Sequence, residues 1–240
     1  MVLFIHGFLE GPSQFETLAS LAVEAGWDAR ALLLPGHGGT GKAFAKSHRM
    51  IWWQAVDFEI KRLSRQYQQI LLVGHSMGAL FSLLSCEEYA SVCGVVAIAT
   101  PIHLHLKRRG IQSAFKSVTG YFDSKDLYTK ASYEAFSIST KNPITCFNWA
   151  PRYLELFKLI RVTKERVSQI QKPISLIQCE QDEFVKASSL SWLEAHLSSE
   201  SLQTLTLSNS GHFYYDETDQ VLLNRHFEAV LVQFSGRPQH

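Results

Sequence analysis

The sequence predicts an α/β fold, with a mostly parallel sheet of about six strands and helices on both of its faces. Short, continuous apolar runs recur along the chain, and such runs are typical of parallel strands that are covered on both sides. Segments with apolar residues at helical spacing separate these runs, and strands that alternate with helices indicate a parallel sheet. A chain of 240 residues could form one large domain or two small ones, and α/β folds of this size are commonly a single domain.

The expected elements follow one another with recognisable boundaries. Pro12 suits the first turn of a helix, and Gly26 suits the position just after its last turn. The Pro-Gly-His-Gly-Gly run at residues 35–39 has the glycine content of a loop. We expect strands at residues 2–5, 27–34, 70–73, 94–99, 174–178 and 202–207. We expect helices at residues 12–25, 50–66, 79–84 and 218–234.

The alternation of strands and helices pauses after Pro101. Residues 102–169 have a helical, polar pattern with scattered aromatic side chains and no strong strand. Long structureless loops are rare inside compact domains, so this segment fits an inserted helical cap better than a connection. We therefore expect residues 1–101 and 170–240 to form the core and residues 102–169 to form a small cap inserted in it. Most of the aromatic side chains in the cap are expected to pack within it.

Composition and charge argue against several classes of protein. The formal net charge is +1, so electrostatics suggest neither nucleic acid nor an anionic membrane as a partner. The chain has no run of the roughly 18 apolar residues that a membrane span needs, and no basic segment precedes residues 1–5 as in a signal peptide. Cys86, Cys93, Cys146 and Cys179 follow no C-x-x-C spacing, and we interpret them as reduced thiols. We expect a cytoplasmic protein with no stable membrane anchor, and the sequence leaves its oligomeric state open.

The pentapeptide Gly74-His75-Ser76-Met77-Gly78 matches the pattern G-x-S-x-G. It follows an apolar run that predicts a strand and precedes a segment that favours a helix, which is the context of a nucleophile elbow. Glycines are needed on both sides of the serine because a Cβ there would collide with the strand or the helix. Ser76 would lie at the N-terminus of the helix, where the dipole and free N–H groups favour an oxyanion. We therefore expect Ser76 to be a nucleophile.

A serine nucleophile needs an imidazole to take its proton and an acid to orient that imidazole. On this architecture both partners follow the serine in the chain, at the carboxyl ends of later strands, in the order acid and then histidine. Asp182 follows the strand at 174–178, and His212 follows the strand at 202–207. Glu180 and Glu183 are alternatives for the acid. The other histidines have more ordinary explanations, in helices (His196, His226), at the start of the cap (His103, His105), in the glycine loop (His37) or pointing away from the serine (His75).

An oxyanion hole needs two backbone N–H groups aimed at the carbonyl oxygen as it becomes charged. The residue after the nucleophile, Met77, is expected to supply one of them. The loop after the first strand, His6-Gly7-Phe8, is expected to supply the other from Phe8, because Gly7 lets the backbone turn over the site.

These motifs resemble those of the α/β-hydrolases. His6-Gly7-Phe8, the glycine loop at 35–38, the elbow, Asp182 and Gly211-His212 occur in the order of that family over nearly the whole chain. The stretches Trp52-Trp53-Gln54 and Gln181-Asp182-Glu183 are similar to those of small bacterial carboxylesterases and monoacylglycerol lipases with a compact cap. The resemblance implies hydrolysis of carboxylic esters through an acyl-serine intermediate, with no cofactor and no metal ion. Many members have two more strands before the His-Gly loop, so a sheet of about six strands is expected here.

The expected substrate is a small-molecule ester with an apolar acyl group of short to medium length, since the cap is rich in Phe, Tyr and Leu. The alternative is a lyase or C–C bond hydrolase on the same fold that acts on an acidic metabolite. That function would need basic side chains in the cap, and the candidates are Lys107, Arg108, Arg109, Arg152 and Lys158. A non-catalytic binding protein is disfavoured because every position of the triad and the elbow is intact.

Overall fold

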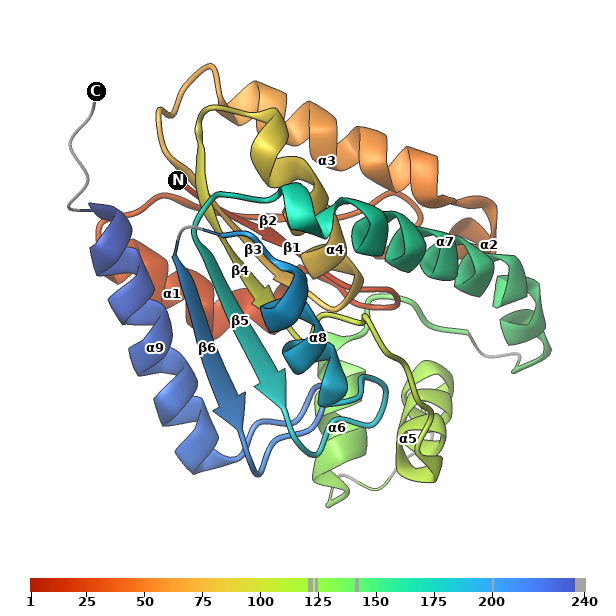
Figure 1. Cartoon of the computed structure of the whole chain (residues 1–240). Coiled ribbons are helices and arrows are strands. Elements are labelled where there is room, and N and C mark those ends of the chain that lie inside the picture. The colour runs from red at the N-terminus through yellow and green to blue at the C-terminus, as the bar shows by residue number, and fades with distance from the viewer. Residues whose placement is uncertain (121–122, 124, 141–142, 200, 236–240) are drawn as a thin grey trace.

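A six-stranded, all-parallel sheet forms the centre of the computed structural model, which describes residues 1–120, 123, 125–140, 143–199 and 201–235. The strand order is β2-β1-β3-β4-β5-β6 (Figure 1). The strands are β1 (Val2–Ile5), β2 (Ala29–Leu32), β3 (Ile70–His75), β4 (Val92–Ile98), β5 (Ile174–Cys179) and β6 (Leu202–Leu207). Every neighbouring pair is parallel, which confirms the predicted fold class.

Helices cover both faces of this sheet, as predicted. On one face lie α1 (Glu16–Glu24), which continues the 3-10 turn η1 (Pro12–Phe15), and α9 (Glu217–Ser235). On the other face lie α3 (Arg49–Leu63), α4 (Met77–Ser85), α7 (Ala150–Arg166) and α8 (Ser188–His196). The short helix α2 (Gly41–Lys46) follows the glycine loop. Two separate apolar cores result, one under each layer of helices.

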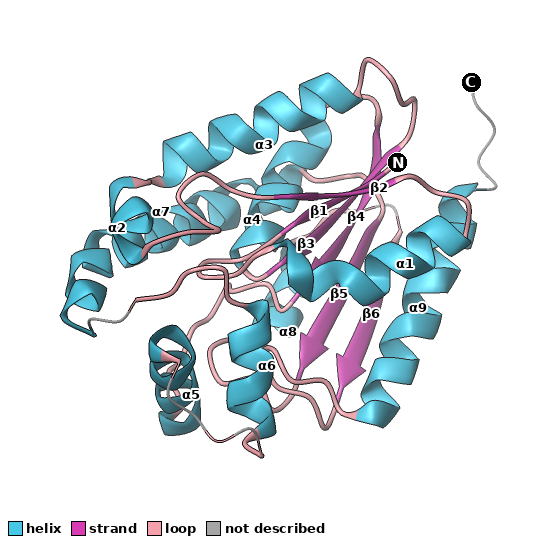
Figure 2. Cartoon of the chain, turned by 180° about the vertical axis from the view of Figure 1, so that it is seen from behind, coloured by secondary structure: helices cyan, strands magenta, loops and turns pink. Residues whose placement is uncertain are grey.

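Helices α5 (Arg108–Thr119) and α6 (Leu127–Ala135) pack against each other beyond the carboxyl ends of the strands (Figures 1 and 2). After them come the 3-10 segment η3 (Pro143–Trp149) and α7. Although α7 lies in the range expected for the cap, its Leu156 and Leu159 are buried in the core beside α3 and α4. A cap domain at 102–169 thus stays a proposal, and this packing favours assigning α7 to the core. Residues 121–122, 124 and 141–142 of the expected cap, and 200 and 236–240 of the expected core, lie outside the described residues.

Two short backbone ladders join the segment 102–139 to the loops at the strand ends. Residues 103–107 run antiparallel to residues 183–186, with the N–H groups of His105 and Lys107 donating to the carbonyl oxygens of Phe184 and Glu183 at 2.9 and 3.0 Å. Residues 135–137 pair in the same way with residues 9–11, through a bridge between Glu10 and Phe136. The segment is therefore hydrogen-bonded directly to both loops. Within the described ranges, no helix is both long enough and apolar enough to span a bilayer.

Candidate active site

Ser76 occupies the sharp turn between β3 and α4. Its backbone has φ 53° and ψ −120°, a conformation that residues with a Cβ rarely adopt. A Cβ at Gly78 would lie 1.8 Å from the carbonyl oxygen of Ile5, and a Cβ at Gly74 would lie 2.5 Å from the backbone nitrogen of Ala79. Only glycine fits either position, and the predicted context of strand, turn and helix is present.

The loop after β1 is fixed by two histidines. His6 Nδ1–H donates to the carbonyl oxygen of Gly7 at 2.9 Å, and its Nε2 accepts the Leu34 N–H at 3.0 Å. Burial, together with nearby His37, lowers the pKa of His6 to about 3, so the neutral ring that these bonds require is the stable form. The Gly7–Phe8 peptide is trans, so anchoring its carbonyl on one side points the Phe8 N–H to the other side.

The carbonyl of Phe8 is anchored as well, because His37 Nε2 donates to it at 2.8 Å. Met77 is the first residue of α4, so its N–H has no acceptor within the helix. The two expected oxyanion donors thus lie in the loop after β1 (Phe8) and at the first position of α4 (Met77), and neither N–H group is hydrogen-bonded to another described residue. The contributions of His6 and His37 were not predicted, although both lie in motifs that the sequence singles out.

Asp182 and His212 meet at the carboxyl ends of β5 and β6. The distance between Asp182 Oδ2 and His212 Nδ1 is 2.7 Å, and Asp182 Oδ1 accepts the N–H groups of Phe184 and Val185 at 2.7 and 2.8 Å. Asp182 is completely buried. Burial would raise the pKa of its carboxyl, but the His212 ring and the two N–H donors outweigh burial and lower the pKa. An ionised acid therefore faces the imidazole.

The alternatives for the acid and the base lie elsewhere. Glu180 is exposed, and Glu183 bonds the backbone of His212 rather than its ring. His196 stacks on Trp192, and His226 is bonded to Ser175. The side chain of Ser76 forms no hydrogen bond with any residue in the described part of the chain, so its bond to a base is not made in this structure. Such bonds are often long in unliganded enzymes and tighten when substrate binds.

A buried carboxylate, Glu10, lies on the other side of the His212 ring. Its Oε1 is 3.9 Å from His212 Nε2, and its Oε2 accepts from the Gly7 N–H and, at 2.6 Å, from Gln14 Nε2. Although burial raises the pKa of Glu10, the rings of His75 and His212 and the Gln14 amide lower it to about 2. The sequence analysis missed Glu10, whose only signal is a charged residue in an otherwise apolar and glycine-containing loop.

His75 completes this cluster. Its Nδ1 is 2.9 Å from Glu10 Oε2, and its Nε2 is 3.1 Å from the carbonyl oxygen of His212. Both partners are acceptors, so the ring can donate to both of them only when each of its nitrogens carries a hydrogen. Ligand atoms of Glu10, His75 and His212 all lie within 4.8 Å of one another, as they would in a metal site. The hydrogen bonds of His75 account for the cluster without an ion.

His212 therefore sits among several carboxylates. Burial lowers the pKa of its ring, but Asp182, Glu10 and Glu183 together raise it above the ordinary value of 6.5. The arrangement favours a ring that accepts a proton readily. Such a ring suits the role of a general base, which becomes positively charged when it takes a proton during the reaction.

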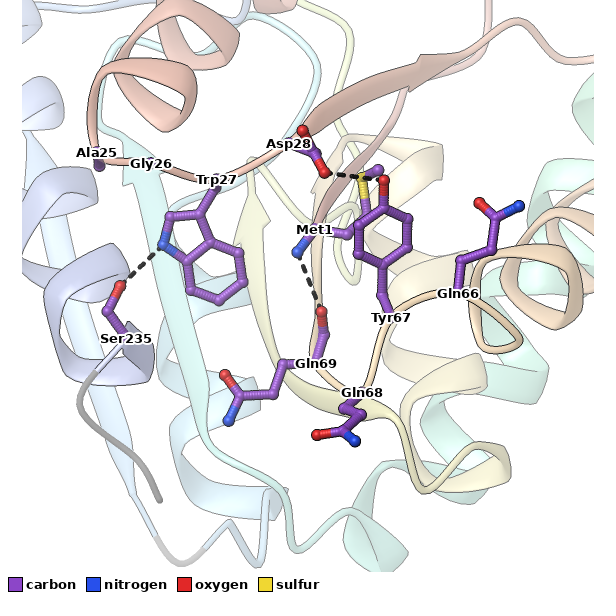
Figure 3. A pocket seen from close by; sticks show the side chains of 10 residues that line it. All are labelled: Met1, Ala25, Gly26, Trp27, Asp28, Gln66, Tyr67, Gln68, Gln69 and Ser235. Carbon is purple, nitrogen blue, oxygen red and sulfur yellow. Dashed lines mark hydrogen bonds between the residues drawn. The ribbon is translucent and has the colours of Figure 1, made fainter. Parts of the chain in front are cut away.

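A cavity of about 450 Å³ reaches His75 and His212 from between α1 and α6. Its wall mixes polar groups (Gln14, Glu134) with aromatic groups (Phe213, Tyr215). A second cavity, of about 520 Å³, lies at the amino ends of β1 and β3, at the opposite end of the sheet from Ser76 (Figure 3). Its polar groups bond one another, Trp27 to Ser235 and Tyr67 to Asp28. The first cavity is thus the one that borders His212, although Ser76 is not among its lining residues.

Comparisons with known proteins place this geometry in a family. The family model described as Hydrolase_4, serine aminopeptidase S33, matches residues 1–219. A thermostable monoacylglycerol lipase of Bacillus sp. (strain H-257) is 24% identical over 222 residues, which cover 92% of this chain and 86% of the lipase.

Two of the solved structures that share the fold are of lipolytic enzymes. A structure of the metagenome-derived lipolytic enzymes LipS and LipT has a TM-score of 0.75 at 18% identity, covering 97% of this chain and 93% of the other. The monoacylglycerol lipase of Paleococcus ferrophilus has a TM-score of 0.71 at 19% identity, with the same coverage of both chains. This chain is therefore a serine hydrolase of the α/β-hydrolase superfamily, similar to lipases and esterases, and belongs to the Hydrolase_4 family.

Proposed function

We propose that the protein is a carboxylesterase that cleaves esters with short to medium acyl chains, with Ser76 as nucleophile, His212 as base and Asp182 as the acid that orients it. The observation that carries the proposal is the buried 2.7 Å contact between Asp182 and His212, together with the strained turn that holds Ser76 at the N-terminus of α4. The similarity to monoacylglycerol lipases supports an ester as the substrate.

In the proposed reaction, Ser76 Oγ forms a bond to the ester carbonyl carbon while His212 Nε2 takes its proton. The N–H groups of Phe8 and Met77 stabilise the negative oxygen. The bond to the alcohol oxygen then breaks, and the proton on Nε2 passes to the leaving alcohol. Water, deprotonated by the same nitrogen, attacks the acyl-serine, and the acid leaves as Ser76 regains its proton. No cofactor takes part in these steps.

The alternative lyase needs free basic groups near the site. Arg109 is paired with Glu183, Lys158 with Glu155, and Arg152 donates to the carbonyl oxygens of Ala45 and Ser47. Three of the five candidate cations are thus held by the protein itself, and this favours an uncharged ester over an acidic metabolite, although within the described residues no ion pair holds Lys107 or Arg108.

A series of p-nitrophenyl esters with increasing acyl length tests the proposal. We expect a maximum of kcat/KM at a short or medium chain, because an acyl pocket of limited size favours each added methylene only until it is full. The absence of turnover at every length, in protein whose circular dichroism shows a folded state, would contradict the esterase proposal and direct the search to acidic substrates.

The pH dependence of kcat/KM reports the state of His212 in the free enzyme. The neutral ring is the active form, and the pKa of His212 is raised, so activity falls as the pH drops through a value above 6.5. Replacing Glu10 with Gln keeps an acceptor for His75 but removes a negative charge that raises this pKa. The acid limb of the Glu10→Gln profile should therefore move to lower pH.

The matched control is Glu24→Gln, which removes an exposed carboxylate from α1. Its profile should coincide with that of the parent protein. A Glu10→Gln profile with an unmoved acid limb would show that Glu10 does not act on the base.

A further inference from the structure

The main chain of His212 is held by side chains on both sides. Glu183 Oε2 accepts the His212 N–H at 2.9 Å, and the His212 carbonyl oxygen is bonded by His75 at 3.1 Å. Glu183 is only 4% exposed. The loop that carries His212 has no regular secondary structure. These side-chain bonds therefore help to determine where the imidazole lies.

The other oxygen of Glu183 faces a positive charge from α5. Arg109 Nη2 lies 2.9 Å from Glu183 Oε1. This contact is an ion pair and not an aligned hydrogen bond, because Glu183 Oε1 has no hydrogen-bond partner among the described residues. The same nitrogen donates to the carbonyl oxygen of Gln181 at 3.2 Å. A buried carboxylate is costly unless a charge compensates it, and Arg109 supplies that compensation.

Arg109 belongs to α5, and its side chain also contacts α6. Its guanidinium lies 3.7 Å from the centre of the Tyr128 ring, and Tyr128 contacts Tyr214, two residues after His212, with ring centres 4.7 Å apart. The cation and the ring attract each other through the negative face of the aromatic system. A continuous set of contacts therefore runs from α5 and α6 to His212.

Two glycines allow this close approach. A Cβ at Gly110 would lie 2.6 Å from Cβ of Glu183. A Cβ at Gly211 would lie 2.7 Å from Cε1 of Tyr128 and 2.8 Å from Glu183 Oε2. Helix α5, Glu183 and the backbone before His212 are thus packed with no room for a side chain at either position.

We propose that Glu183 is a positioning residue for His212, and that Arg109 holds Glu183 in place from α5. The proposal rests on the assignment of His212 as the base. Helices α5 and α6 and the imidazole then behave as one unit, joined by the Arg109–Glu183 pair as well as by the ladder between residues 103–107 and 183–186. Asp182 sets the orientation of the ring, and Glu183 sets the position of the backbone from which the ring projects.

The kinetic test compares Glu183→Ala with Glu183→Gln on the best ester of the series. Alanine removes the acceptor of the His212 N–H, so kcat should fall by about 10- to 100-fold, because a small displacement of a catalytic group costs that much. KM should stay unchanged, since Glu183 does not touch the substrate. Glutamine keeps an acceptor oxygen and should restore most of kcat. Glu180→Ala, which removes an exposed carboxylate from the same loop, is the control and should retain the parent kcat.

Arg109 is tested in a double-mutant cycle. Arg109→Ala alone should lower kcat, whereas adding it to Glu183→Ala should cause no further loss, because the two residues act through one contact. Independent, additive effects would overturn the role given to Arg109. A Glu183→Ala enzyme with the parent kcat, or one whose loss appears in KM alone, would overturn the role given to Glu183.

A second readout needs no turnover and separates this proposal from the esterase assignment. The proton in the hydrogen bond between His212 Nδ1 and Asp182 gives a downfield resonance in the proton NMR spectrum of the whole protein. We expect Glu183→Ala to shift or broaden this resonance and Glu183→Gln to preserve it. An unchanged resonance in folded Glu183→Ala protein would overturn the proposal, even if no ester were cleaved at all.

Discussion

Replacing Ser76 with alanine is expected to lower ester turnover on the order of 10⁴-fold or more and to leave the fold intact. The hydroxyl is the only group at the elbow that can form the acyl-enzyme. Alanine is smaller than serine, and the Ser76 side chain makes no hydrogen bond to the described residues whose loss would destabilise the protein. The turnover that remains is expected from direct attack of water on the ester, with the oxyanion donors stabilising the negative oxygen. Steady-state kinetics and thermal unfolding of both proteins measure the two effects.

The control for this change is Ser20→Ala. Ser20 lies on the exposed side of α1, where its hydroxyl bonds only the carbonyl oxygen of Glu16 in the same helix. Its turnover should equal that of the parent. A Ser76→Ala protein that keeps a substantial part of the parent activity would show that the nucleophile is another group.

Replacing Gly78 with alanine is expected to have the largest effect on stability. The new Cβ would lie 1.8 Å from the carbonyl oxygen of Ile5 and 2.8 Å from that of His6, which are backbone atoms at the end of β1 and in the loop that follows it. Neither can move without disturbing β1 or the loop that carries Phe8. We expect a loss of about 3 kcal/mol or more in the free energy of unfolding, or no folded protein.

Gly39→Ala is the matched control, because a Cβ at Gly39 would meet no atom within 4 Å. Its free energy of unfolding should stay within about 0.5 kcal/mol of the parent value. Urea unfolding followed by circular dichroism measures both variants. A Gly78→Ala protein as stable as the Gly39→Ala protein would mean that α4 does not approach β1 as closely as described.

The centre of the sheet could be predicted largely from the sequence because β1, β3 and β5 are buried on both faces. The apolar run at residues 2–5 and the strand at 202–207 have the predicted bounds, and the run at 70–73 extends by two residues to His75. The edge strand β2 was predicted too long, since only Ala29–Leu32 pair with β1. Helix α8 was predicted only in that His196 was expected to lie in a helix, and its bounds were not, because its few buried residues, such as Leu193, do not form a clear apolar face.

The candidate site was predictable where a residue's place follows from chain order. Ser76, Asp182 and His212 each follow a strand, and parallel strands bring their carboxyl ends to one edge. Glu10 and Glu183 have no such signal. Their contacts depend on how loops meet in space, since Glu10 and His75 are 65 residues apart in the chain and Glu183 and His212 are 29 residues apart. The side chains that surround the base therefore required the structure.

Labelling with a fluorophosphonate, followed by mass spectrometry of the peptides, identifies the nucleophile directly. These reagents form a covalent bond with a serine that an adjacent base activates. We predict one adduct, on the peptide that contains Ser76, and none in the Ser76→Ala protein. An adduct on a different residue, or no adduct on folded protein, would contradict the assignment of Ser76, His212 and Asp182 as a catalytic triad.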